Sequence, residues 1–167
     1  SPNLSSMFTR CAKLRTVTLN NVGNGANANM DSMFARSFLN SANTTAPVTL
    51  TRVGNGESAT LEDMFRDSRY VRSLSLNDVG NGASANMRYA WAGLAGANSF
   101  TVKDVGEGTE ANLTSAFAYG YCLVTASLTN VGTNSKANLT TMMYRNGYND
   151  TTYGAPPANA TGHYTLD

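Results

Sequence analysis

A repeat of 26 residues runs through most of this chain and limits its possible folds more than any other feature. An apolar residue that follows Asn or Thr recurs at steps of 26, 31, 26, 26 and 26 residues. These positions are Leu4, Met30, Leu61, Met87, Leu113 and Leu139. The longer step contains five additional residues, within the segment Asn40–Pro47. Because a unit this short cannot bury its apolar face alone, the repeat predicts a stacked solenoid.

The first part of each unit has the apolar spacing of an amphipathic helix. In the first unit the apolar residues stand at i, i+3, i+4, i+7 and i+10, on one face of a 3.6-residue period. They are Leu4, Met7, Phe8, Cys11 and Leu14. The residue before each helical pattern is a preferred N-cap. These caps are Asn3, Asn29, Thr60, Asn86, Asn112 and Asn138. The pattern therefore predicts a helix of about ten residues in every unit.

The second part of each unit predicts a short strand and a turn. Apolar and β-branched residues alternate at 17–19, 48–50, 74–76, 100–102 and 126–128. A Val-Gly pair follows each strand, as in Val22-Gly23, and glycine allows the chain to reverse there. We expect the valine to fill the core at the turn.

The predicted architecture is an α/β leucine-rich-repeat solenoid of about six helix-strand units, with a parallel sheet on one face. The units start near residues 3, 29, 60, 86, 112 and 138, and residues 1–167 form a single domain. Residues 148–162 interrupt the sixth unit as an inserted loop, and residues 163–166 supply its strand. The chain opens directly on a repeat without an initiator Met, which indicates a fragment or a processed form of a longer protein.

Composition and charge argue against several functional classes. Only 14% of residues are charged and the net charge is +1, so a nucleic-acid-binding stripe is not expected. No apolar run reaches the roughly 18 residues of a membrane span, so we expect no membrane insertion within this segment. The single histidine, His163, provides no triad or metal cluster, so the sequence predicts neither an enzyme, a cofactor nor a metal site.

Two further patterns are interpreted as structural. Cys11 and Cys122 lie four repeats apart, roughly 20 Å at the spacing of parallel strands, so both are predicted to be free thiols. The Gly-x-Gly turns resemble phosphate-binding loops only superficially, since they lack the Lys-Ser/Thr of a P-loop. They recur in four successive units, which indicates an architectural role.

The first unit closely resembles the BspA-like leucine-rich repeats, whose pattern is Asn-Met-Ser-x-Met-Phe-x-x-Cys-x-x-Leu-x-x-Leu-x-Leu. The matching positions are Leu4, Met7, Phe8, Cys11, Leu14, Val17 and Leu19. The resemblance covers essentially the whole chain, although the family's Cys is kept only at Cys11 and Val replaces the usual aromatic residue after the strand. It implies a secreted or surface-anchored protein, often linked with adhesion, but identifies no ligand because the family shares a scaffold more than a site.

The outward-facing strand positions are the main candidate binding residues. A central column is predicted to contain Thr18, Thr49, Ser75, Thr101, Ser127 and Thr165. One flanking column comprises Thr16, Pro47, Ser73, Ser99, Thr125 and His163, and the other comprises Asn20, Thr51, Asn77, Lys103, Thr129 and Asp167. This surface can bind a glycan, a protein or ordered water, or its residues can simply suit exposed sheet. In the predicted insertion and final strand, Tyr148, Tyr153 and Tyr164 are further contact candidates.

Three functions are compatible with these patterns. The preferred one is a non-catalytic extracellular or cell-surface module for adhesion, which recognises a protein or glycan of a host or neighbouring cell. The alternative is a structural subunit of a surface filament or layer, a homo-polymer that grows by end-to-end stacking of exposed strand edges. The third is an ice-binding array of Thr and Ser, although Pro47, Lys103 and His163 interrupt it.

Overall fold

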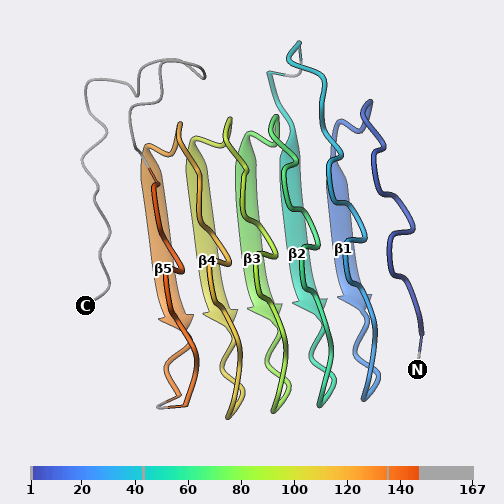
Figure 1. Cartoon of the computed structure of the whole chain (residues 1–167), viewed down its shortest axis with the longest axis vertical. Helices are drawn as coiled ribbons and strands as arrows, with labels where there is room; N and C mark the ends of the chain where they lie inside the picture. The colour runs from blue at the N-terminus through green and yellow to red at the C-terminus, as the bar shows by residue number, and fades with distance from the viewer. Residues whose placement is uncertain (1, 43, 135, 147–167) are drawn as a thin grey trace.

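The computed structural model describes residues 2–42, 44–134 and 136–146. Its main element is a sheet of five parallel strands in the order β1-β2-β3-β4-β5 (Figure 1). The strands are β1 (Val17–Val22), β2 (Pro47–Val53), β3 (Ser73–Val79), β4 (Ser99–Val105) and β5 (Thr125–Val131). Each circuit of the chain adds one strand beside the preceding one, so the described residues form a β-solenoid with the predicted parallel sheet.

The strands pair at equivalent positions of successive units. Leu19 pairs with Leu50, and Leu50 pairs with Leu76, although the first step contains the five extra residues and the second does not. The alternation expected from the sequence is present, because Leu50 and Leu76 point inward and are buried whereas Thr101 is exposed. The repeat therefore predicted both the strands and their register correctly.

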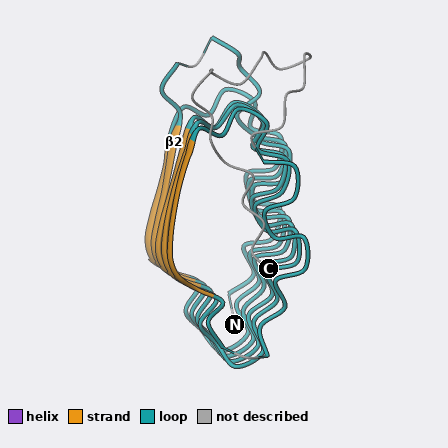
Figure 2. Ribbon diagram, turned by 90° about the vertical axis from the view of Figure 1, so that its left-hand side faces the viewer, coloured by secondary structure: helices purple, strands orange, loops and turns teal. Residues whose placement is uncertain are grey.

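The prediction of a helix in each unit is wrong. The described residues contain no α-helix, and the segments expected to be helical are successions of tight turns on the side opposite the sheet (Figure 2). Their alternate amides bind the neighbouring unit rather than their own segment. The Phe8 N–H donates to Met33 O at 2.8 Å, and the Phe34 N–H donates to Met64 O at 2.7 Å. A helix would instead join each amide to the carbonyl four residues earlier.

Left-handed residues explain why the turns imitate a helical pattern. In the third unit Asp63 (φ 54°) and Asp67 (φ 57°) reverse the chain at an interval of four residues. This places Leu61, Met64, Phe65 and Ser68 inside, at i, i+3, i+4 and i+7, which is also the helical spacing. A short helix leaves about four amides and four carbonyls unpaired at its ends, whereas the turns pair such groups across units.

The predicted N-cap residues stabilise turns instead of helices. The Asp31 N–H donates to Asn29 Oδ1 at 3.0 Å, and the Thr114 N–H donates to Asn112 Oδ1 at 3.1 Å. This bond from the amide two residues later is an Asx turn, a conformation that competes with helix. The cap positions also form isolated parallel bridges with one another, from Asn3 through to Asn138. Their side-chain oxygens accept amide bonds as expected, but the segment that follows is not helical.

The core lies between the sheet and the turns, as predicted. Aromatic rings stack along the solenoid axis, with centroids 5.1 Å apart for Phe8 and Phe34 and 4.7 Å apart for Phe34 and Phe65. Trp91 and Phe117 continue this pattern at 5.0 Å. The valines that precede the glycine turns are fully buried in the central units, namely Val53, Val79 and Val105. Apolar side chains of successive units thus share one interior.

The Gly-x-Gly turns carry a ladder of side-chain hydrogen bonds, which supports their architectural interpretation. The Asn55 N–H donates to Asn24 Oδ1, and the Asn81 N–H donates to Asn55 Oδ1, both at 3.0 Å. The Glu107 N–H continues the series by donating to Asn81 Oδ1 at 3.0 Å. A Cβ atom built on Gly82 would lie only 1.8 Å from Gly56 O, so the units touch through glycine backbone.

Candidate functional site

The sheet face carries the predicted polar columns in register. The central column of the described strands contains Thr18, Thr49, Ser75, Thr101 and Ser127. The flanking columns contain Pro47, Ser73, Ser99 and Thr125 on one side, and Asn20, Thr51, Asn77, Lys103 and Thr129 on the other. Thr16 precedes β1 and does not pair in the sheet. The predicted residues thus form a lattice, with strands about 4.8 Å apart and an outward side chain at every second residue.

This lattice offers many hydroxyl and amide groups but little binding energy per side chain. Its columns contain one charged residue, Lys103, whose Nζ lies 3.7 Å from Asp104 Oδ2. The columns include no Tyr, Trp or Arg, which dominate the energetics of most protein interfaces. The remaining predicted site residues lie outside the described part of the chain. They are Tyr148, Tyr153, His163, Tyr164, Thr165 and Asp167.

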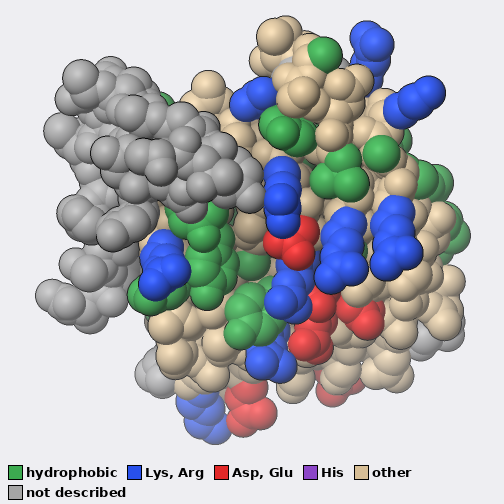
Figure 3. Space-filling model, turned by 45° about the horizontal axis from the view of Figure 1, so that its top comes forward, with side chains coloured by type: hydrophobic (Ala, Val, Ile, Leu, Met, Phe, Trp, Pro, Cys, Tyr) green, Lys and Arg blue, Asp and Glu red, His purple; other side chains and the backbone are tan. Residues whose placement is uncertain are grey.

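Arginine and tyrosine side chains instead gather on the turn face, the surface made by the turns opposite the sheet. Figure 3 shows basic, acidic and apolar side chains interspersed over it. The turns in residues 3–14 and the equivalent segments bring these side chains to the surface, because most of their left-handed residues point outward. Those residues include Arg10, Arg36, Asp63, Asp67, Tyr89, Tyr119 and Arg145. The sequence patterns did not indicate this face.

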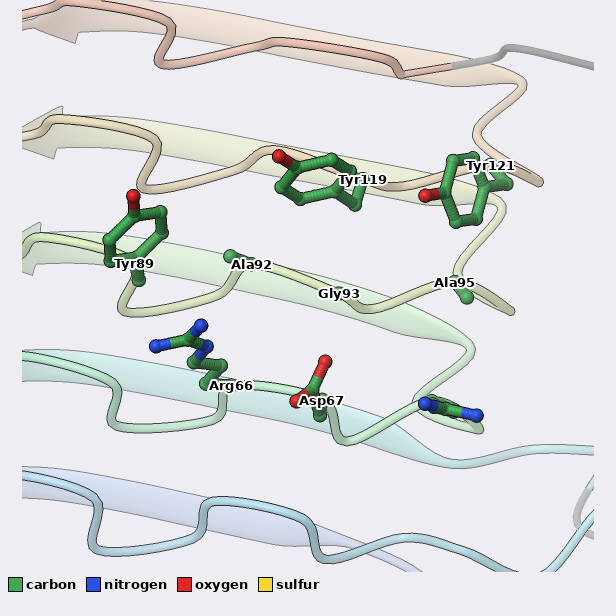
Figure 4. Close-up of a pocket in the computed structure, with 9 residues that line it drawn as sticks. Arg66, Asp67, Tyr89, Ala92, Gly93, Ala95, Tyr119 and Tyr121 are labelled. Atoms are coloured by element: carbon green, nitrogen blue, oxygen red, sulfur yellow. The ribbon is translucent and has the colours of Figure 1, made fainter.

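A hollow of about 310 Å³ lies on the turn face over the fourth unit, and we call it the trough. Its lining residues are Arg66, Asp67, Arg69, Tyr89, Ala92, Gly93, Ala95, Tyr119 and Tyr121. Figure 4 shows that Ala92, Gly93 and Ala95 occupy the middle coil, with charged side chains on one neighbouring coil and tyrosines on the other. The trough therefore has a floor of small side chains, a charged wall and an aromatic wall.

Contacts between the wall residues hold them in place before any ligand binds. The guanidinium carbon of Arg66 lies 4.8 Å from the ring centroid of Tyr89, a distance that favours cation–π attraction. Arg66 Nη1 also lies 3.2 Å from Asp63 Oδ1. On the opposite wall the ring centroids of Tyr119 and Tyr121 are 6.2 Å apart in an edge-on arrangement. Such contacts reduce the entropy that binding would cost.

A second hollow of about 380 Å³ lies on the same face over the first three units. It is lined by Ser6, Thr9, Arg10, Ser32, Ala35, Arg36, Asp63 and Arg66. It has charged and hydroxyl groups like those of the trough but no aromatic lining residue. The two hollows therefore allow the contribution of the tyrosines to be separated from that of the charges.

The trough has a sequence signal that becomes visible when units are compared with one another. The fourth unit has Ala92-Gly93 where the third has Arg66-Asp67 and the fifth has Ala118-Tyr119. Three residues further on it has Ala95-Gly96, in place of Arg69-Tyr70 and Tyr121-Cys122. A unit with small outward residues between two units with large ones leaves a depression, but this conclusion requires knowing that these positions point outward.

The cysteine thiols and the Asp78 carboxylate lie among structural contacts. Cys11 and Cys122 are not joined in a disulfide, as predicted, and burial raises the pKa of Cys122 although Arg72 opposes this effect. Asp78 Oδ1 accepts from Asn55 Nδ2 at 2.9 Å, so this carboxylate belongs to the ladder. Among residues 2–42, 44–134 and 136–146, no three His, Cys, Asp or Glu residues gather in a way that could hold a metal ion. The same residues include no helix long and apolar enough to cross a membrane.

Comparisons with known proteins add no functional information. No family model matches the chain, and neither a curated protein nor a solved structure matches it. Functional inference therefore depends on the geometry of the two faces.

Proposed function

We propose that the protein is a non-catalytic recognition module of the extracellular space or cell surface, which binds a glycan of a host or neighbouring cell through its turn face. The observation that supports this most directly is the trough. It brings Arg66, Arg69, Tyr119 and Tyr121 together around a floor of small residues. These side chains come from separate units, and only stacking places them around one hollow.

The size and composition of the trough favour a small ligand or one segment of a polymer. A volume of about 310 Å³ lies at the lower end of the roughly 300–1,000 Å³ typical of ligand sites. A stable protein partner would need about 800 Å² of surface on each side. Tyrosine combines a flat apolar ring with a polar tip, and Asp67 supplies acceptors for hydroxyl groups. These groups suit a sugar ring, which has both hydroxyls and an apolar C–H face.

The resemblance to BspA-like surface repeats is consistent with this proposal and remains a prediction. A surface location also agrees with the low content of charged residues. The sheet face then serves mainly to space and support the turn face, since parallel pairing fixes the distance between units. If a ligand contacts both faces, substitutions on each will weaken its binding.

A glycan array probed with the fluorescently labelled protein tests the proposal. We expect selective retention that Tyr119→Ala lowers at least tenfold, because the substitution removes one of the two rings of the aromatic wall. Thr101→Val on the sheet face is the matched control and should leave retention unchanged. Loss of retention in the control alone, or no retention by the wild type on any glycan, would contradict the proposal.

End-to-end assembly into a filament is the second candidate, supported by the direction of the hydrogen bonds on the turn face. From Leu4 to Arg10 and in the equivalent residues of later units, the backbone-to-backbone bonds between units run from an amide to the next unit along the chain, as from Leu4 N to Asn29 O at 2.7 Å and from Leu113 N to Asn138 O at 2.8 Å. A second copy would extend this ladder only head to tail. The first unit also has exposed apolar side chains, including Met7 (53%) and Phe8 (38%).

Electron microscopy and sedimentation of the purified protein test the filament. We expect fibres or a concentration-dependent series of oligomers, and Met7→Lys should shorten them because it adds a charge to the first unit's apolar end. A wild type that stays monomeric at high concentration would exclude this candidate.

A further inference from the structure

We infer that the trough selects a pyranose sugar that carries a carboxylate over the neutral form of the same sugar. This inference rests on the proposed function, because it assigns the ligand class of the turn-face site. It uses three properties of the trough: its excess of positive charge, the geometry of its arginines and the position of its tyrosines.

The charge around the trough favours an anion. Two guanidinium groups, those of Arg66 and Arg69, line the trough against one carboxylate, that of Asp67. The charged residues in contact with the lining coils or with their ion pairs are Arg36, Arg72 and Arg88, with the carboxylates of Glu62 and Asp63. The carboxylates already lie beside arginines, at 3.2 Å for Asp63 and Arg66, 3.6 Å for Glu62 and Arg88, and 3.9 Å for Asp67 and Arg36. An incoming carboxylate would therefore enter a region of net positive charge.

Arginine geometry favours a carboxylate in particular. A guanidinium group presents parallel N–H donors that match the two oxygens of a carboxylate. Asp63 contacts Arg66 only through Nη1, so this ion pair does not occupy the whole donor edge of the arginine. Arg72 marks the far end of the floor, where its Nη1 donates to Gly96 O at 3.2 Å. A ligand along the floor would thus lie between guanidinium groups at both ends.

The tyrosines indicate that the anion is attached to a ring. Tyr119 and Tyr121 make the aromatic wall, with ring centroids 6.2 Å apart, and Tyr119 is also packed against Tyr144 at 5.8 Å. This wall faces the charged coil across Ala92 and Gly93 (Figure 4). A simple anion has no ring to stack on the tyrosines, and a neutral sugar forms no ion pair with the arginines. A sugar acid uses both walls.

A matched pair of ligands tests the inference, namely trigalacturonate and its fully methyl-esterified form, which has the same rings without the charge. Binding is measured by isothermal titration calorimetry and by backbone NMR shifts in about 50 mM salt. We expect the acid to bind at least tenfold more tightly than the ester, and a lower affinity for the acid in 300 mM salt because its charges are screened.

Three variants locate the binding. Arg69→Met should lower the affinity for the acid several-fold while leaving that for the ester unchanged. Arg10→Met removes the same charge from the second hollow, which has no aromatic lining residue, and should change neither. Ala95→Tyr should abolish binding of both ligands because it fills the floor. The fifth unit already has Tyr121 at the equivalent position, so the fold should accept this side chain.

The possible outcomes separate the inference from the proposed function. Equal binding of acid and ester, both abolished by Ala95→Tyr, would overturn the inference and leave glycan recognition intact. Acid binding that Ala95→Tyr spares, or that Arg10→Met lowers as much as Arg69→Met, would also overturn the inference, since it would show diffuse attraction to a basic surface. Acetate that binds as tightly as trigalacturonate would reduce the trough to an anion site. If no glycan of any charge binds, both proposals fail.

Discussion

Replacing Gly82 by alanine should destabilise the solenoid because of the contact between units rather than because of glycine's backbone freedom. Gly82 is not among the glycines with positive φ, so alanine can adopt its backbone conformation. The added Cβ would nevertheless lie 1.8 Å from Gly56 O and 2.6 Å from the carbon of the same carbonyl group. Both neighbours are backbone atoms, which cannot rotate away as a side chain can.

The cost follows from the bonds that must lengthen. To reach an ordinary contact of roughly 3.4 Å, the second and third units must move apart by about 1.5 Å at the turn. This would break three bonds between units, from Gly80 N to Val53 O (2.9 Å), from Ser84 N to Glu57 O (2.8 Å) and from Asn81 N to Asn55 Oδ1 (3.0 Å). At about 1 kcal/mol each, the loss is about 3 kcal/mol. For a chain of this size the thermal midpoint should fall by roughly 6–12 °C.

Gly25→Ala is the matched control, since it lies in an identical Gly-Asn-Gly sequence. Its added Cβ would meet only Pro2 Cδ, at 3.4 Å, so the free energy of unfolding should change by less than about 1 kcal/mol. Urea unfolding followed by circular dichroism measures both variants, and amide exchange at Ser84 shows whether the effect is local. Equal losses in the two variants would refute the explanation by contact between units.

Three further predictions concern the ladder, the sheet face and a thiol. Asn81→Ala should lower the free energy of unfolding in urea by roughly 2 kcal/mol, because it removes the acceptor of the Glu107 N–H and the donor to Asp104 O. An unchanged urea midpoint would show that the ladder does not stabilise the fold. If the sheet face binds ice, the wild type should show thermal hysteresis that Thr101→Tyr abolishes, and absence of hysteresis in the wild type would exclude that function. Because burial raises the pKa of Cys122, its thiol should react with iodoacetamide more slowly at pH 8 than the thiol of glutathione does, and its rate should increase as the pH rises. Mass spectrometry measures both rates, and equal rates for Cys122 and glutathione would contradict the prediction.

The sequence predicted the repeat, the strands, their register and the buried valines. These features depend on the alternation of inward and outward residues in each strand, and that alternation recurs every 26 residues. It did not predict the conformation of the other half of each unit. Inward side chains at i, i+3, i+4 and i+7 occur both in a helix and in turns with a left-handed residue at every fourth position. Asp63, Asp67 and Gly93 are types that tolerate this conformation, but Tyr89 and Tyr119 adopt it too, so residue type alone gives a weak signal.

The candidate site was predicted less well than the fold for the same reason. If these segments were helices, Arg66 and Tyr119 would not belong to any surface that the repeat pattern defines. The sheet columns were therefore the leading candidates. Within the five described strands the columns were located correctly, except for Thr16, which precedes the sheet, because strand pairing alone sets their positions. The trough requires knowledge of which turn residues point outward and how adjacent coils align. Only the hydrogen bonds between units supply that information.

The segment between the first and second units shows how independent the solenoid is of its connections. Phe38 and Ala46 are fully buried on either side of the extra residues, whereas Leu39 is 42% exposed and Thr44 lies on the surface. The strands on both sides keep the pairing found elsewhere in the sheet. A foreign peptide such as an epitope or a peptide tag could be grafted here at little cost in stability, because lengthening a surface loop costs little free energy. The same position would let natural variants diversify what the surface displays while the scaffold stays constant.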